Sequence, residues 1–175
     1  PIAALVMTGA RPLVGVLGFE SEGTEMVVWT MRAFLFGLAG HAMLEVAARA
    51  FYARQDARTP LLAAGLTFLA FAGVAYLLVR RWGVTGIGLA NSLAFSGEAL
   101  LLWLLLERRY PGVLGLGGTL LRAALAGLLG AGVVYILLHL SLPIPGLVQA
   151  LLALGFGGLV VLPFIWSEVK LLVRL

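Results

Sequence analysis

The stretch GVTGIGLANSLAFSGEALLLWLLL, residues 83–106, runs for 24 residues with a single charged side chain, Glu98. A helix needs about 20 predominantly apolar residues to cross the hydrocarbon core of a bilayer. A barrel strand is about half as long and alternates lipid-facing with lumen-facing residues, a pattern that this run lacks. Residues 83–106 are therefore predicted to form a transmembrane helix.

Apolar segments of the same kind lie on both sides of this stretch, and Pro or Gly marks nearly every connection between them. The sequence predicts an all-α, polytopic transmembrane helix bundle with five full spans and the end of a sixth. The further full spans are predicted at 27–51, 61–79, 120–142 and 146–166, and the partial span at 1–17. Because the chain opens at Pro1 inside an apolar stretch, it is expected to be the C-terminal part of a longer protein.

The composition agrees with a membrane location and argues against soluble enzymes. Of the 175 residues, 62% are hydrophobic and 11% are charged, with a mean hydropathy of +1.07. A soluble domain averages about 45–50% apolar and about 25% charged residues. Without cysteine, and with only His41 and His139 far apart, a thiol nucleophile or a Cys/His metal centre is not expected. The chain is predicted to be no enzyme and to carry no cofactor or metal, apart from a coupling ion of unknown identity.

The basic residues predict the orientation of the spans. The connections 49–60 and 107–122 and the tail 167–175 hold three, three and two Lys or Arg residues, eight in all. The connections on the other side (18–25, 80–86 and 139–146) hold two. The positive-inside rule therefore places the first group, including the C-terminus, in the cytoplasm. Since the net charge of +4 is concentrated at span ends, lipid headgroups and not nucleic acid are the expected acidic partner.

His41, Glu45 and Arg49 recur every four residues in the predicted span 27–51, so they form one stripe on a helical face. One interpretation is a proton or cation relay, or a polar cavity that binds an anionic substrate. The alternative is a Glu45–Arg49 ion pair near the end of the span, with His41 forming a hydrogen bond between helices. The alternative is favoured, because such pairs are common near span ends.

Glu98 lies near the middle of its span, seven residues after Asn91 and thus on the same helical face. An uncompensated carboxylate there costs roughly 2.5–3.5 kcal/mol on insertion scales, so a partner, a proton or water is expected. Two alternatives remain open: Glu98 is protonated and hydrogen-bonded, or it faces an interior cavity.

Small residues at helix-packing spacing predict close helix contacts, since lipid provides no hydrophobic drive between spans. Static packing is favoured over sliding helices. The predicted packing sites are Gly65 with Gly73, Gly83 with Gly86 and Gly88, Ala126 with Gly130, and Gly127 with Ala131.

Two stretches carry a resemblance to a known family. The run RAFYARQDARTP, residues 49–60, closely resembles a characteristic loop of the MurJ (MviN) lipid II flippases, and residues 83–109 resemble the span that follows in the family. The residues of this loop are Arg49, Tyr52, Arg54, Asp56, Arg58 and Pro60. The stretch LGFESEG, residues 17–23, departs from the Leu-Phe-x-Arg-Gly-like turn usual in the family, so no role is assigned to a basic residue there.

The resemblance implies a fourteen-span fold with two six-helix lobes around a cavity, followed by two additional helices that hold the lipid tail. Residues 1–109 would then complete the second lobe from the end of the ninth span, and residues 110–175 would form the additional helices and a short cytoplasmic tail. The principal substrate arginines of the family lie mainly in earlier spans. The candidates for lining the cavity in this chain are Glu45, Arg49, Asn91, Glu98 and His41.

The implied function is transport of undecaprenyl-pyrophosphate-linked peptidoglycan precursor across the bacterial cytoplasmic (inner) membrane by alternating access. The implied partners are this lipid-linked precursor, membrane lipids and the N-terminal spans of the same chain. Two alternatives stay open. One is a sibling exporter of another lipid-linked oligosaccharide or of drugs coupled to cations, and the other is a membrane scaffold that transports nothing.

Overall fold

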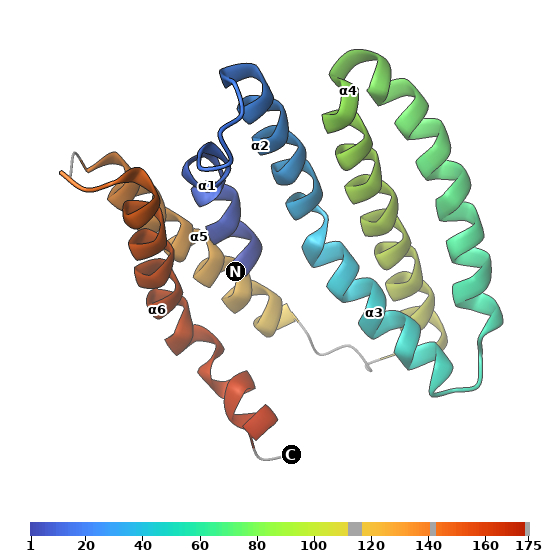
Figure 1. The fold of residues 1–175 in the computed structure, drawn as a ribbon. Coiled ribbons are helices and arrows are strands. Elements are labelled where there is room, and N and C mark those ends of the chain that lie inside the picture. Colours follow the sequence, from blue (N-terminus) through green and yellow to red (C-terminus); the bar gives the residue numbers. More distant parts are fainter. Residues whose placement is uncertain (112–116, 141–142, 174–175) are drawn as a thin grey trace. The chain divides into compact units, whose positions relative to one another are not determined.

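A computed structural model of the chain describes residues 1–111, 117–140 and 143–173, and throughout these residues the only regular secondary structure is α-helix (Figure 1). Helix is expected because a backbone without water must satisfy its own hydrogen bonds. The all-α prediction is thus confirmed. The helices are α1 (Ile2–Gly15), α2 (Ser21–Phe36), α3 (Leu38–Tyr52), α4 (Arg58–Arg109), α5 (Gly117–His139) and α6 (Gly146–Val173).

Helix α4 consists of two antiparallel arms, residues 58–82 and 84–109, that fold back on each other at Gly83 (Figure 1). Gly83 has φ 52° and ψ −133°, a backbone conformation open to glycine and unfavourable for other residues. A Cβ on Gly86 would lie 2.6 Å from the carbonyl carbon of Leu78, so the arms meet closely beside the turn. The predicted spans 61–79 and 83–106 are confirmed, but their connection is a single residue instead of the predicted 80–86.

The predicted span 27–51 is interrupted at Gly37, which separates α2 from α3. The N–H of Gly37 bonds to the carbonyl of Phe34 (3.1 Å), one residue short of the usual helical acceptor, Ala33. The hydroxyl of Ser92, on the second arm of α4, donates to the carbonyl of Ala33 instead. A hydroxyl on a neighbouring helix therefore compensates for the break, which is why the span sequence alone did not reveal it.

Most helices extend beyond the predicted apolar segments. Helix α2 begins at Ser21, inside the predicted connection 18–25, and α6 continues to Val173, beyond the predicted end at 166. A helix rises 1.5 Å per residue, so extra turns reach from the hydrocarbon core into the headgroup region. Helix α5 ends at His139, and the predicted end of its span at 142 lies outside the described residues. Within the described residues, four stretches are long and apolar enough to cross a membrane, and the fold-back at Gly83 divides one of them into two spans.

The chain divides into two packing units, Pro1–Val28 with Leu116–Leu175, and Trp29–Gly115. In the first, α1, α5 and α6 pack around Leu5, Val134 and Val161. In the second, α3 packs on α4 around Phe51, Leu102 and Leu106. The predicted boundary at residue 109 concerns the lobes of a larger protein, and it stays a prediction.

The predicted small-residue contacts are confirmed in part. A Cβ on Gly130 would lie 2.7 Å from Val161 Cγ2 and 2.8 Å from Leu5 Cδ2, so this glycine allows α5 to approach α6 and α1. By contrast, nothing lies within 4 Å of a Cβ on Gly65 or Gly73, so the packing prediction for that pair is wrong. Spacing identifies a possible contact face but not whether another helix covers it.

A second close contact of small residues in the second packing unit was not predicted. A Cβ on Gly37 would lie 2.6 Å from Ser92 Cα, and one on Gly40 would lie 2.9 Å from Ser96 Cα. These contacts bring α3 and the second arm of α4 to nearly backbone-to-backbone distance.

Replacing Gly40 by alanine is expected to lower the free energy of unfolding by about 1–3 kcal/mol, the usual cost of overpacking an interface. The control is Gly65→Ala on the first arm, where space is open. It should be neutral or stabilising by up to about 1 kcal/mol, since alanine favours helix over glycine. Thermal unfolding of the full-length protein in detergent measures both variants, and equal Tm values would contradict the close α3–α4 contact.

Candidate functional site

Glu98 lies on the second arm of α4 with only 6% of its surface exposed. It lines a pocket of about 230 Å³ between the two arms of α4, together with Thr67 and otherwise apolar residues. Thr67, which is also buried, lines the same pocket, and its side chain interacts with the carboxylate. Glu98 thus has a polar neighbour in a pocket between the arms of α4, while its protonation and its place in an interior cavity stay predictions. The partner residue Thr67 was missed, because it lies on a different span with no spacing signal to link it to Glu98.

His41 brings α3 into the same site. Its ring packs on Phe95, with ring centroids 4.6 Å apart, and Phe95 lies three residues before Glu98 on the second arm. The ring interacts electrostatically with the Glu98 carboxylate. Nδ1 of His41 lies 3.2 Å from the carbonyl oxygen of Gly37, four residues earlier in the chain. Three helical segments thus converge on Glu98.

Glu45 and Arg49 form the ion pair that the favoured interpretation of the stripe predicts, with 3.3 Å between Arg49 Nη2 and Glu45 Oε2. Both side chains are largely exposed, at 70% and 79%. An exposed pair of this kind contributes about 0–1 kcal/mol to stability. The pair therefore does not explain by itself why two charged residues occupy an exposed face of an apolar helix.

Asn91 is half-buried on the second arm of α4. Among the described residues, those that line the pocket include Glu98 but not Asn91. The structure therefore does not bring these two residues into one cavity, although they are one heptad apart. The cavity roles of Asn91, Glu98 and the stripe stay predictions.

The loop after α3 ends that helix with a Schellman motif. The N–H of Asp56 bonds to the carbonyl of Phe51 (3.1 Å), and the N–H of Gln55 bonds to the carbonyl of Tyr52 (2.9 Å). Gln55 has φ 60°, in the left-handed region where glycine is usual. The run of residues 49–60 therefore specifies a helix end and directs Asp56 toward the start of α4.

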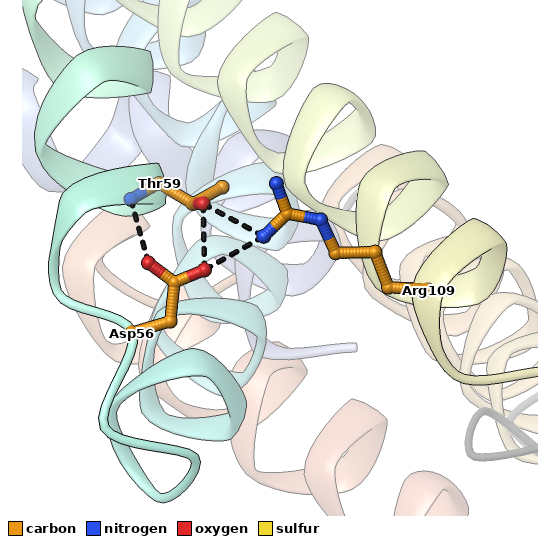
Figure 2. Close-up of polar contacts among 3 residues, drawn as sticks. All are labelled: Asp56, Thr59 and Arg109. Carbon is orange, nitrogen blue, oxygen red and sulfur yellow. Dashed lines mark hydrogen bonds and ion pairs between the residues drawn. The ribbon is translucent and has the colours of Figure 1, made fainter.

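Asp56, Thr59 and Arg109 form a polar cluster that joins the two ends of α4 (Figure 2). The carboxylate of Asp56 accepts the backbone N–H of Thr59 (3.0 Å), its hydroxyl (2.7 Å) and Nη1 of Arg109 (2.7 Å). Arg109 also donates to the hydroxyl of Thr59 (3.0 Å). The cluster closes the open end of the hairpin formed by the two arms.

The other residues of the family-like loop have mixed environments. The guanidinium of Arg54 lies 3.6 Å from the centroid of the Tyr110 ring, in a cation–π contact. Pro60 is buried in the first turn of α4, where its missing N–H costs no helical bond. Tyr52 and Arg58 are exposed. The loop therefore organises the helix ends around it, and its exposed residues remain available for other contacts.

A second pocket of about 250 Å³ continues along the groove between the arms of α4. It shares Leu66 and Leu101 with the first pocket and ends at Thr59 and Arg109. In the part of the chain that the structure describes, no three His, Asp or Glu side chains come together as metal ligands.

The Asp56 cluster predicts a specific pH dependence. Hydrogen bonds from the hydroxyl and backbone N–H of Thr59 hold the pKa of Asp56 below its ordinary value of 3.8. A group whose pKa is lower when folded stabilises the protein above the ordinary pKa and loses that contribution as the pH falls through its folded value. Asp56→Asn should therefore lower the Tm at neutral pH and reduce the loss of Tm between neutral pH and pH values below 3.8. Glu20→Gln, at an exposed carboxylate before α2, is the control, and equal pH profiles for all three proteins would contradict the cluster.

The positive φ of Gln55 predicts how substitutions at this position change the stability of the protein. A side chain in the left-handed region costs about 1–2 kcal/mol relative to glycine, and a β-branched one is the least tolerated. Gln55→Gly should therefore raise the Tm and Gln55→Val should lower it. Denaturation of the purified full-length protein measures the order, and a valine variant as stable as the glycine variant would show that φ is not positive here.

Comparison with known proteins gives two matches. The family model described as lipid II flippase MurJ matches residues 1–156, from α1 into α6. A curated relative, "Probable lipid II flippase MurJ" of Rhizobium meliloti (strain 1021), is 29% identical over 107 residues. The aligned part covers 59% of this chain and 20% of the relative, so the chain spans about a fifth of the curated protein that it matches.

Proposed function

Because the chain belongs to the MurJ lipid II flippase family, we propose that it forms the C-terminal part of a lipid II flippase. The proposed cargo is undecaprenyl-pyrophosphate-linked peptidoglycan precursor, which moves from the cytoplasmic to the outer leaflet of the bacterial inner membrane by alternating access. The observation that carries the proposal is the family match over residues 1–156. Several apolar helices long enough to cross a membrane fit a multi-pass transporter.

One contact supports the proposed orientation. The connections 49–60 and 107–122 are both predicted to be cytoplasmic from their arginines. Asp56 of the first connection and Arg109 of the second form an ion pair of 2.7 Å. The two connections must then lie at the same end of the hairpin, as a shared cytoplasmic location requires. The C-terminus, one further pair of helices along the chain, is proposed to lie on the same side.

The exposed face of α3 is the part of the chain that we propose lines the substrate cavity. Glu45 and Arg49 are exposed there, and His41 is half-buried one turn before Glu45. Charged residues within spans face a bundle interior or a water-filled cavity and avoid lipid tails. In the whole protein this face is therefore proposed to meet water and the anionic headgroup of the precursor, with Arg49 as the cation.

The remaining contacts are proposed from family position. Helices α5 and α6 would hold the lipid tail of the precursor, and the N-terminal spans of the same chain would complete the cavity. No cofactor or metal is proposed.

The test uses the full-length protein in cells depleted of their own lipid II flippase. An external probe counts the precursor accessible on the outer leaflet. The unchanged protein should restore the outer-leaflet precursor. Arg49→Ala should reduce it by about tenfold, as expected for the loss of one charge-assisted contact of about 1.5 kcal/mol. Arg81→Ala, at an exposed arginine of the first arm of α4, is the control and should leave it unchanged.

Two outcomes would contradict the proposal. If protein in the membrane fails to restore the precursor, a sibling exporter or a scaffold becomes the better explanation. If precursor is restored but Arg49→Ala transports normally, the exposed face of α3 does not line the substrate cavity.

A further inference from the structure

Glu98 is a titratable group to which the proposed transport of a lipid assigns no task. It is 94% buried, since only 6% of its surface is exposed, and it lines a pocket whose other residues are apolar apart from Thr67. A carboxylate in this position avoids the free energy of an unpaired buried charge by pairing with a cation or by binding a proton.

The groups around Glu98 come from three helical segments. The first arm of α4 contributes the hydroxyl of Thr67, and α3 contributes the ring of His41. Further along α3, Glu45 and Arg49 are exposed and paired with each other. Among the described residues that line the pocket there is no Lys or Arg. The His41 ring is therefore the basic group that faces this carboxylate.

The contacts of His41 determine which ring nitrogen is available. A carbonyl only accepts hydrogen bonds, so Nδ1, which is 3.2 Å from the Gly37 carbonyl, must carry the hydrogen. In the neutral ring Nε2 then has a free lone pair and accepts a proton. The contact with Phe95 holds this ring on the second arm, one turn from Glu98. Because His41 is only half-buried, water reaches it more easily than it reaches Glu98.

We propose that Glu98 and His41 form a proton-binding site at the contact between α3 and α4. A proton from the aqueous phase reaches Glu98 by way of His41, whose Nε2 binds it before a carboxylate oxygen does. The products are a neutral imidazole and a neutral carboxylic acid in the pocket that Thr67 also lines. Release of the proton to water by the reverse route restores the carboxylate.

Proton occupancy changes the force between α3 and the second arm of α4. An ionised Glu98 attracts a protonated His41, and this attraction is strong where water is excluded. When Glu98 is neutral, the attraction disappears, and the glycine–serine contacts and the apolar packing around Phe51 hold the two helices together. The site therefore gives the packing of α3 on α4 a dependence on pH.

The experiment is infrared spectroscopy of the full-length protein in phospholipid bilayers that contain no lipid II. The stretching band of protonated carboxyl groups is recorded across a pH series. A component of this band should titrate, should be lost in Glu98→Gln, and should remain in Glu45→Gln, the exposed acid on α3. His41→Gln should change the midpoint of this component by about 1–3 pH units, the effect of removing a nearby charge.

A second variant keeps the proposal testable if the Glu98→Gln protein fails to fold. Thr67→Val keeps the shape of the side chain and removes the hydroxyl group from the pocket that Glu98 lines. It should shift the frequency of the titrating component without abolishing it.

Three results would overturn the proposal. They are a wild-type band with no titrating component, a component that survives Glu98→Gln, and a component that responds to Na⁺ or K⁺ at constant pH, which would make Glu98 a cation ligand. The infrared titration does not depend on transport activity. A failed proton site therefore leaves the flippase proposal standing, and a failed flippase assay leaves the proton site standing.

Discussion

The contact of Gly37 and Gly40 with Ser92 and Ser96 is the constraint on which the second packing unit depends. It brings α3 so close to the second arm of α4 that a single added methyl group would clash with backbone. Lipid tails are as apolar as the helices, so such close packing and hydrogen bonds replace the hydrophobic drive that operates in water. The position of His41 beside the arm that carries Glu98 follows from this contact.

The same interface explains the break at Gly37. A helix interrupted within a membrane must find another partner for each carbonyl that it frees, because no water is available in the hydrocarbon core. The hydroxyl of Ser92 supplies that partner to Ala33. The break and the close approach therefore depend on each other, since a serine hydroxyl can reach the carbonyl only when the two helices nearly touch.

The loop of residues 49–60 shows how a sequence that resembles a family motif can have a structural basis. Its Gln55 ends α3, its Asp56 organises the start of α4, and Arg109, at the end of the second arm, pairs with Asp56. Such a loop defines which helix ends lie together. The resemblance of residues 49–60 to the family loop is thus compatible with a role of this loop in folding as well as with a role in transport.

The polar residues of the two helices occupy different environments, which the sequence could not separate. Spacing placed His41, Glu45 and Arg49 on one face of α3, and the structure keeps them there. Yet Glu45 and Arg49 are exposed, while His41 turns its ring toward the neighbouring arm. Glu98 was recognisable as an unusual residue because a lone acid in an apolar run is costly.

The sequence by itself determined that this chain is an all-α membrane protein, and it determined the order of the apolar spans. The physical reason is that lipid requires an apolar run of about 20 residues for each crossing. Only the tertiary structure decided that Thr67 is the partner of Glu98, that Gly65 and Gly73 lie open, and that the span before residue 51 breaks at Gly37. These features depend on which helix faces meet, and that choice results from packing between residues far apart in the chain, on which local periodicity carries no information.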